Sequence, residues 1–386
     1  MGFFSNLFSK SEAEIRSNED FWKWFQKHER SFFEVVQRGD NIEKGFFDKV
    51  SPKLEKLRTG YYCLTGMSDD QTAELIISAE GMVKNFHFVE ELIQAAPNLK
   101  NWKFTALKPA VDISKVGVEM QGYRFDTDHL YFYANNLSSY PDEIDIVVVH
   151  NDWTEENKST ITNGTYIFLD NYLGELNFAT MIDNLTVIGS KEASQELVPI
   201  AKLQDFLTWR QSEFVEKYEG KRANIDEDNY ALLEAELGNG NVSLAVINTD
   251  LLQWDSKASH PWLLTIEIPY DGNNTNGMPD NKTYQLLDEI EDRLVSILKD
   301  EDGYLNIGRQ TSNNIREIFY ACKDFRKPSQ VVSEIQKRYT GVIEMNYDIY
   351  KDRAISNCLT STIQQASSVG ICVNLCAKNL NIEEHL

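Results

Sequence analysis

The clearest pattern of apolar and polar positions lies in the second half of the chain. Apolar residues at every second position predict a half-buried strand over 262–270, and apolar residues at helical spacing predict a helix over 283–298. The same reasoning predicts the elements that follow: strands over 304–311 and 315–322, a helix over 329–339 and a strand over 345–350. This β-α-β-β-α-β order is typical of the ferredoxin-like, split βαβ arrangement. Both helices are expected on one face of the sheet, which leaves the other face free for a partner or for the rest of the chain.

The first half of the chain predicts a mixture of helices and strands. Ser17, followed by Glu19 and Asp20, is typical of a helix start, and the aromatic stripe after it indicates a helix that packs into a core. The pattern of residues 144–150 is the most apolar of this half and predicts a central strand. The remaining predictions are helices over 42–57, 86–95, 173–182 and 194–218, strands over 73–78, 102–107, 166–169 and 185–189, and hairpins over 123–133 and 230–252.

These elements predict an α+β fold with two domains and a tail. We expect an N-terminal α+β domain over 1–220 and a ferredoxin-like domain over 221–353, joined near the polar segment 220–224. The tail over 354–386 is rich in Ser, Asn, Thr and Gln and does not fit the second domain. The length of 386 residues is consistent with this division.

The net charge narrows the class of partner. The chain carries a formal charge of −22, so its field repels nucleic-acid phosphates and favours a basic protein partner. No basic patch is evident in the sequence, and direct nucleic-acid binding is therefore not expected. The alternative is that the acidity serves solubility alone.

The cellular location is predicted from the lack of a targeting segment and of a membrane-spanning segment in the sequence. The apolar start of the chain is short and lacks a basic region and a cleavage site, and no uncharged apolar run is long enough to cross a membrane. The five cysteines are scattered and odd in number, which favours a reducing compartment. We expect a cytoplasmic protein without a membrane partner.

No motif of a known catalytic or cofactor site is present. The sequence lacks a phosphate-binding glycine loop, the zinc-protease HExxH pattern and the GxSxG nucleophile pattern. Cys372 and Cys376 have no second pair to complete a zinc site, and His150 is interpreted as a hydrogen-bonded histidine at a strand end. We predict no cofactor, no metal and no catalytic residue.

The most informative polar residues surround the hairpin over 304–322. With a turn centred on Ser312 and Asn313, Arg309 and Arg316 would lie directly opposite each other and would need carboxylates or an anion to offset their repulsion. Glu267 and Glu317 are the candidate carboxylates. The two interpretations left open are an ion-paired structural face and a binding site for an anion or an acidic partner. The candidate binding residues are Arg309, Thr311, Asn314, Arg316, Glu317 and Glu267.

Several short motifs occur in the order found in one bacterial family. They are His260-Pro261-Trp262-Leu263, Gly277-Met278-Pro279, Ile290-Glu291-Asp292, Gly308-Arg309-Gln310-Thr311, Arg316-Glu317 and Tyr347-Asp348-Ile349-Tyr350-Lys351-Asp352. With them the chain resembles the domain-of-unknown-function family six-nine-five, whose domain is similar to the regulator of ribonuclease E activity B. That resemblance implies a ferredoxin-like fold and an acidic protein that inhibits an endonuclease by binding it. The chain departs from the family pattern where Arg353-Ala354-Ile355 replaces an aromatic pair.

These observations lead to two functional hypotheses. The first is a non-enzymatic protein that binds and regulates a partner such as a nuclease or another basic protein. The alternative is an enzyme that acts on a small anionic substrate held by Arg309 and Arg316, with Glu317 as the base.

Overall fold

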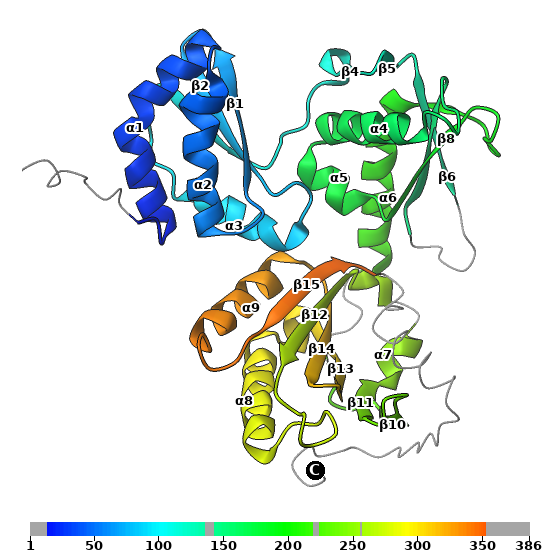
Figure 1. The fold of residues 1–386 in the computed structure, drawn as a ribbon. Helices are drawn as coiled ribbons and strands as arrows, with labels where there is room; N and C mark the ends of the chain where they lie inside the picture. Colours follow the sequence, from blue (N-terminus) through cyan, green and yellow to red (C-terminus); the bar gives the residue numbers. More distant parts are fainter. Residues whose placement is uncertain (1–13, 136–142, 219–223, 255–256, 353–386) are drawn as a thin grey trace, which may run out of the picture. The chain divides into compact units, whose positions relative to one another are not determined.

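The structure is a computed structural model that describes residues 14–135, 143–218, 224–254 and 257–352. Helices and strands are mixed throughout (Figure 1), which confirms the predicted α+β class. The chain divides into two compact units, one of residues 1–130 with 150–179 and the other of residues 131–149 with 180–386. The predicted linker over 220–224 and the tail over 354–386 lie almost entirely outside the described residues, so the predicted domain boundaries stay predictions.

The first unit begins with a helical pair packed on a small sheet. Ser17 caps the first helix as predicted, because its side chain accepts a hydrogen bond from the backbone of Asp20. The three strands pair in the order β1-β2-β3, and rings of α1 pack edge-to-face against Trp102 and Phe104 of β3. The elements are α1 (Asn18–Arg38), a π-helical turn (Glu43–Phe47) that runs into α2 (Asp48–Leu57), β1 (Tyr62–Asp69), β2 (Thr72–Ser78), α3 (Val83–Gln94) and β3 (Trp102–Ala106).

The same unit contains a second, smaller group of elements. They are β4 (Val118–Met120), β5 (Tyr123–Phe125), α4 (Lys158–Leu173) and α5 (Glu175–Met181). Phe125 lies so close to Gly164 of α4 that a Cβ there would come within 2.1 Å of its ring. The predicted hairpin over 123–133 is wrong, because β5 pairs with β4 whereas the residues after 130 join another sheet. The predicted strand over 166–169 is also wrong, because these residues lie inside α4.

The second unit contains a four-stranded sheet in the order β8-β7-β6-β9. The predicted central strand is β7, which lies between β8 and β6 and is buried over most of its length. Phe132 of β6 packs against Phe206 of α6, which begins later than predicted. The elements are β6 (Leu130–Asn135), β7 (Asp145–His150), β8 (Asn184–Gly189), β9 (Val198–Pro199) and α6 (Leu203–Tyr218).

The C-terminal part of this unit is a six-stranded sheet in the order β10-β11-β13-β14-β12-β15. All of its neighbouring strands are antiparallel. The predicted strands and helices are all present within a few residues of their predicted bounds. They are β10 (Tyr230–Glu236), β11 (Val242–Asn248), α7 (Thr249–Gln253), β12 (Trp262–Pro269), α8 (Asn281–Ile297), β13 (Tyr304–Ser312), β14 (Ile315–Cys322), α9 (Arg326–Arg338) and β15 (Asn346–Lys351).

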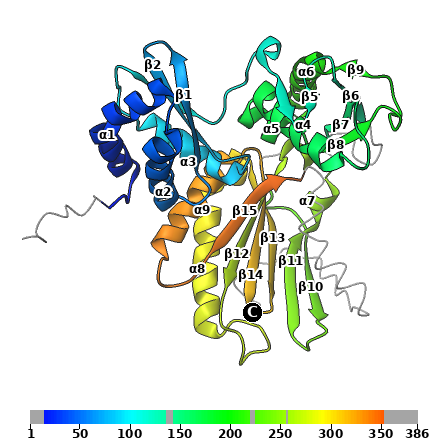
Figure 2. The same ribbon diagram turned by 45° about the horizontal axis from the view of Figure 1, so that its top comes forward.

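The two faces of this sheet are covered by different elements (Figures 1 and 2). Helices α8 and α9 lie side by side on one face, linked by a hydrogen bond from Arg293 to the hydroxyl of Tyr339. On the opposite face, Leu251 of α7 packs on Ala245 and Ile247 within a buried apolar cluster. We call these the helix face and the α7 face. Because side chains alternate along a strand, the register assigns every residue of the sheet to one of the two faces.

Candidate functional site

The hairpin that carries the predicted site turns one residue later than expected. Asn313 and Asn314 form a two-residue turn, both with positive φ (47° and 69°), as a type I′ hairpin requires. Ser312 therefore pairs with Ile315, and Arg316 lies opposite Thr311. The prediction that the two arginines are directly opposite is wrong. Arg309 pairs with Ile318, so the arginines are diagonal neighbours on the helix face.

Both arginines are buried in an ion-paired network with α8. The guanidinium of Arg316, which is 1% exposed, lies 3.0 Å from Asp288 and 3.6 Å from Glu291. Arg309 donates to the same Glu291 carboxylate at 3.0 Å. The Nε of Arg316 also donates to the hydroxyl of Thr311 at 3.1 Å. Two cations and two carboxylates therefore satisfy one another inside the protein.

Helix α8 supplies the partners because of its spacing. Tyr284, Asp288 and Glu291 lie four and three residues apart, so they share one side of the helix. The ring of Tyr284 lies 5.1 Å from the Arg316 guanidinium, in a cation–π arrangement. Burial works against the charge of Arg309, but the adjacent Glu291 carboxylate raises its pKa overall. The contacts with the α8 carboxylates hold both guanidinium groups in place.

Glu267 and Glu317 are not the partners of these arginines. They lie on the α7 face, where they pair directly opposite each other on β12 and β14. Glu317 also lies opposite Gln310 of β13, whose amide donates to Ser243 at 3.3 Å. The predicted pairing failed because Arg316 and Glu317 are consecutive in a strand and point to opposite faces.

The two glutamates repel each other. Burial, and then the charge of Glu267, raise the pKa of the Glu317 carboxyl. Glu317 is half-buried and Glu267 is exposed. Within the part of the chain that the structure describes, neither carboxylate has a hydrogen-bond or ion-pair partner. Like charges directly opposite in a sheet are unfavourable, so this pair costs the folded state stability.

Asn314 has a local role in the turn. Its backbone carbonyl accepts from the amide of Tyr270 at 2.8 Å, and its side-chain amide donates to Asn273 at 3.2 Å. The six predicted residues therefore fall into three groups. Arg309, Thr311 and Arg316 meet on the helix face, Glu267 and Glu317 meet on the α7 face, and Asn314 shapes the turn.

His150, the histidine singled out at a strand end, is fully buried and hydrogen-bonded. Its Nε2 faces the carbonyl of Arg124 at 3.0 Å, while its Nδ1 accepts from the backbone of Asp152 at 3.0 Å. Burial lowers the pKa of this imidazole, which favours the neutral form with its proton on Nε2. Both ring nitrogens have structural partners, so the arrangement does not need a substrate.

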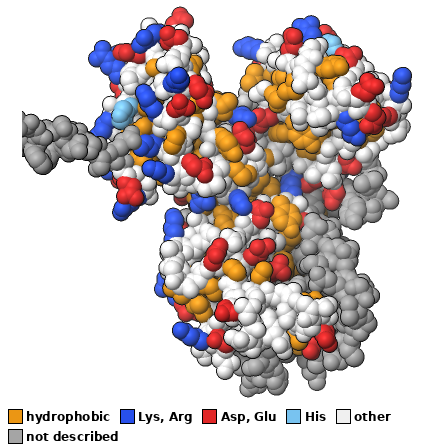
Figure 3. All heavy atoms as spheres, in the orientation of Figure 1, with side chains coloured by type: hydrophobic (Ala, Val, Ile, Leu, Met, Phe, Trp, Pro, Cys, Tyr) orange, Lys and Arg blue, Asp and Glu red, His pale blue; other side chains and the backbone are white. Residues whose placement is uncertain are grey.

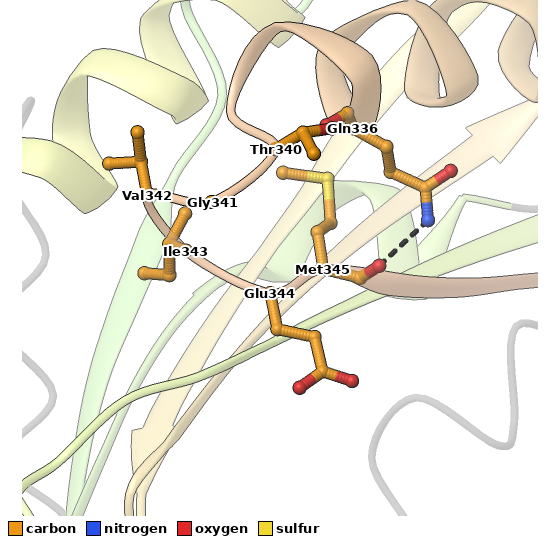
Figure 4. Close-up of a pocket in the computed structure, with 7 residues that line it drawn as sticks. All are labelled: Gln336, Thr340, Gly341, Val342, Ile343, Glu344 and Met345. Carbon is orange, nitrogen blue, oxygen red and sulfur yellow. Dashed lines mark hydrogen bonds between the residues drawn. The ribbon is translucent and has the colours of Figure 1, made fainter.

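A shallow hollow lies at the end of α9 (Figure 4). It has a volume of about 410 Å³, and its wall is the loop that leads from α9 into β15. Gln336 closes one side by donating to the carbonyl of Met345 at 2.7 Å, while the Glu344 side chain points away from Gln336. The lining residues are Gln336, Thr340, Gly341, Val342, Ile343, Glu344 and Met345. The hollow contains no cluster of titratable groups that would indicate catalysis.

The charged side chains of the visible surface are interspersed. Figure 3 shows Lys and Arg among Asp and Glu on this face, with apolar side chains between them. Over the described ranges, no group of three or more His, Cys, Asp and Glu side chains is placed to hold a metal ion. None of the helices that could be described is both long and apolar enough to cross a membrane.

The carboxylates of α8 are the site residues that sequence reasoning missed. In the sequence, Glu291 belongs to the Ile290-Glu291-Asp292 motif, whereas Asp288 belongs to none of the motifs. The spacing of Tyr284, Asp288 and Glu291 beside a strand with two arginines is the signal that could have identified them.

Comparison with known families gives a match for one segment of the chain. Residues 236–354 match the model of a family of unknown function (DUF695). This segment includes β11 to β15, and thus both arginines and both glutamates. The chain has no significant match among curated proteins or solved structures.

Proposed function

We propose that this chain is a non-enzymatic regulatory protein that binds a basic partner protein, such as a nuclease that it inhibits. A ferredoxin-like module over residues 224–352 would present the binding surface. The strand order β15-β12-β14-β13 and the β-α-β-β-α-β element order support that module. The resemblance to the regulator of ribonuclease E activity B supports an inhibitory role, and the scattered free cysteines Cys63 and Cys322 are compatible with a cytoplasmic location.

The opposed pair of Glu267 and Glu317 carries this proposal. The two carboxylates lie directly opposite each other in the sheet, and their repulsion costs the folded protein stability. A lysine or arginine from a partner would bridge both carboxylates and relieve that repulsion through charge-assisted hydrogen bonds. The net charge of −22 would also speed the encounter with such a partner.

The arginine network weakens the alternative of an enzyme for anionic substrates. Arg316 is 1% exposed, and Asp288 and Glu291 already neutralise it and Arg309. An incoming anion would have to displace two carboxylates held on a helix. Glu317, the base of that hypothesis, lies on the opposite face of the sheet.

The test uses a partner that is captured from the native cell by affinity purification with the full chain. The affinity of this partner is then compared between the unchanged chain and a Glu267→Gln/Glu317→Gln double variant. We expect the double variant to bind the captured partner about tenfold more weakly, because a bridging cation would lose both charges. Association of the unchanged protein should slow as salt rises, since the Debye length falls to about 8 Å at physiological ionic strength.

A matched control removes two exposed carboxylates elsewhere, in a Glu119→Gln/Glu156→Gln variant with the same change in net charge. It should retain the affinity of the unchanged chain. Equal affinities for both double variants, or tight RNA or DNA binding at moderate salt in a filter assay, would refute the proposal.

A further inference from the structure

The helix face of the six-stranded sheet is only partly covered. Helix α8 reaches β13 and β14 through its contacts with Arg309 and Arg316, and Phe325, the N-cap residue of α9, packs on Trp262 of β12. Strands β10 and β11 extend the sheet beyond β13 on the side away from α9 (Figure 2). Helix α7 lies on the other face, where Leu251 packs on Ala245 and Ile247.

Alternation identifies what β10 and β11 present on the helix face. Val246 lies opposite Arg309, and Leu244 lies opposite Thr311, so both belong to that face. Their partners on β10 are Leu232 and Glu234. The outer helix face therefore consists of Leu232, Glu234, Glu236, Val242, Leu244 and Val246.

The apolar members of this outer helix face reach solvent. Leu232 is 38% exposed, and Val242, Leu244 and Val246 are half-buried. A β-strand that belongs to a core would bury such residues, as β11 does on its other face with Ala245 and Ile247. The outer helix face is therefore a strip of aliphatic side chains without a matching layer in the described chain.

The strip has the dimensions of one helix. Neighbouring strands lie about 4.8 Å apart, so two additional strands widen the sheet by about 10 Å. That is the diameter of an α-helix, and packed helices lie about 8–10 Å from each other. Seven residues of strand span about 24 Å, which matches a helix of about 16 residues. A helix beside α8 would continue the layer that α8 and α9 begin.

The charge of the outer helix face indicates what kind of helix would bind there. Glu234 and Glu236 are exposed, and neither makes an ion pair or hydrogen bond with any residue the structure describes. Toward α8, Arg309 and Arg316 balance Asp288 and Glu291, so the net charge comes from the two glutamates of β10. We propose that the outer helix face binds an amphipathic helix of a partner protein, with its apolar side on Leu232, Leu244 and Val246 and its basic side toward Glu234 and Glu236.

A second copy of this chain is a poorer occupant. A two-fold contact between two outer helix faces would place Glu234 and Glu236 of both copies, without a basic residue of that face, in one interface, and like charges at an interface oppose association. The inference rests on the proposed function only for the basic character of the partner. Its surface is different from that of Glu267 and Glu317, so the two proposals can fail separately.

The experiment uses the full chain with labelled Ile, Leu and Val methyl groups and a synthetic Leu/Lys peptide of about five amphipathic helical turns. We expect saturable shifts of the methyl signals of Leu232, Val242, Leu244 and Val246. A scrambled peptide of the same composition should bind at least about tenfold more weakly, because it cannot present one apolar side. Shifts spread over unrelated methyl groups, or equal binding of the scrambled peptide, would overturn the inference.

Two variants test which surface of the protein binds the peptide. Glu234→Lys/Glu236→Lys changes exposed residues and should weaken peptide binding by about tenfold, the size expected for reversal of two rim charges. Glu267→Gln/Glu317→Gln should bind the peptide as the unchanged chain does, even if it loses the captured partner. Undiminished binding by the lysine variant would overturn the inference, as would a dimer whose formation shifts the same methyl signals.

Discussion

Arg316 has a charged side chain that is buried between the six-stranded sheet and α8. Its environment offsets the cost of removing a guanidinium from water with Asp288, Glu291, the hydroxyl of Thr311 and the ring of Tyr284. Such a site tolerates the loss of one member poorly, because the carboxylates that remain are partly buried without a full complement of cations.

Replacing Arg316 should therefore lower the stability of the folded protein strongly. We expect Arg316→Ala to lower the free energy of unfolding by about 3 kcal/mol, as is typical when one partner of a buried ion pair is removed. The control is Arg30→Ala, whose ion pair with Glu34 is exposed and should contribute less than about 1 kcal/mol. Urea denaturation measures both. Similar losses for the two variants would contradict a structural role for Arg316.

Glu317 presents the opposite case, a charge that the folded state disfavours. Because the pKa of Glu317 is raised in the folded protein, folding is penalised once the pH exceeds the pKa of the unfolded chain, and the penalty becomes complete above the folded pKa. Glu317→Gln should thus stabilise the protein at neutral pH, by less than about 1 kcal/mol because Glu267 is exposed and screened.

The stabilisation should disappear below about pH 4, where the carboxyl is protonated in both states. Thermal unfolding of the variant and the unchanged chain across this pH range measures the difference. A destabilised variant at neutral pH would show that Glu317 has a favourable partner. Together with weaker partner binding, a stabilised variant would be the signature of a residue kept for binding at the expense of stability.

At the scale of elements, prediction succeeded where the pattern had a single period. The alternation in β12 and the helical spacing in α8 identified both elements, because each has one face toward a core. The strand β1 was missed, since Tyr62 and Leu64 remain exposed and its pattern does not separate two faces. The hairpin over 123–133 failed because pairing partners are chosen by tertiary contacts, which local sequence does not report.

The predicted arrangement of the two arginines depended on placing the β13–β14 turn correctly to within one residue. A turn at Ser312-Asn313 would have placed the two arginines opposite each other, whereas the turn at Asn313-Asn314 places them diagonally. Asn accepts positive φ more readily than Ser, so the Asn-Asn dipeptide carried the better signal. Of the two interpretations left open for the arginines, the ion-paired face agrees with their contacts to Asp288 and Glu291. The carboxylates named from the sequence were wrong, because identifying the right ones required knowing that α8 crosses this face.

At the scale of the whole molecule, the six-stranded sheet is assembled from one continuous stretch of chain. Every strand of that sheet, together with α8 and α9, lies between residues 224 and 352. The compact units nevertheless group this stretch with residues 131–149 and 180–218, and Lys351 forms a buried ion pair with Asp183 at 3.1 Å. Whether the stretch folds alone depends on its own core.

We expect the fragment 224–352 to unfold cooperatively, because it retains all strand partners and the apolar cluster around Ala245, Ile247 and Phe319. Its stability should be lower than that of the same region in the full chain, since Lys351 loses Asp183. A shorter fragment, 249–352, lacks β10 and β11 and removes Ala245 and Ile247 from the cluster, so it should lose the sharp transition. Circular dichroism during heating distinguishes these outcomes. A gradual transition in the longer fragment would mean that residues before 224 are part of its folding unit.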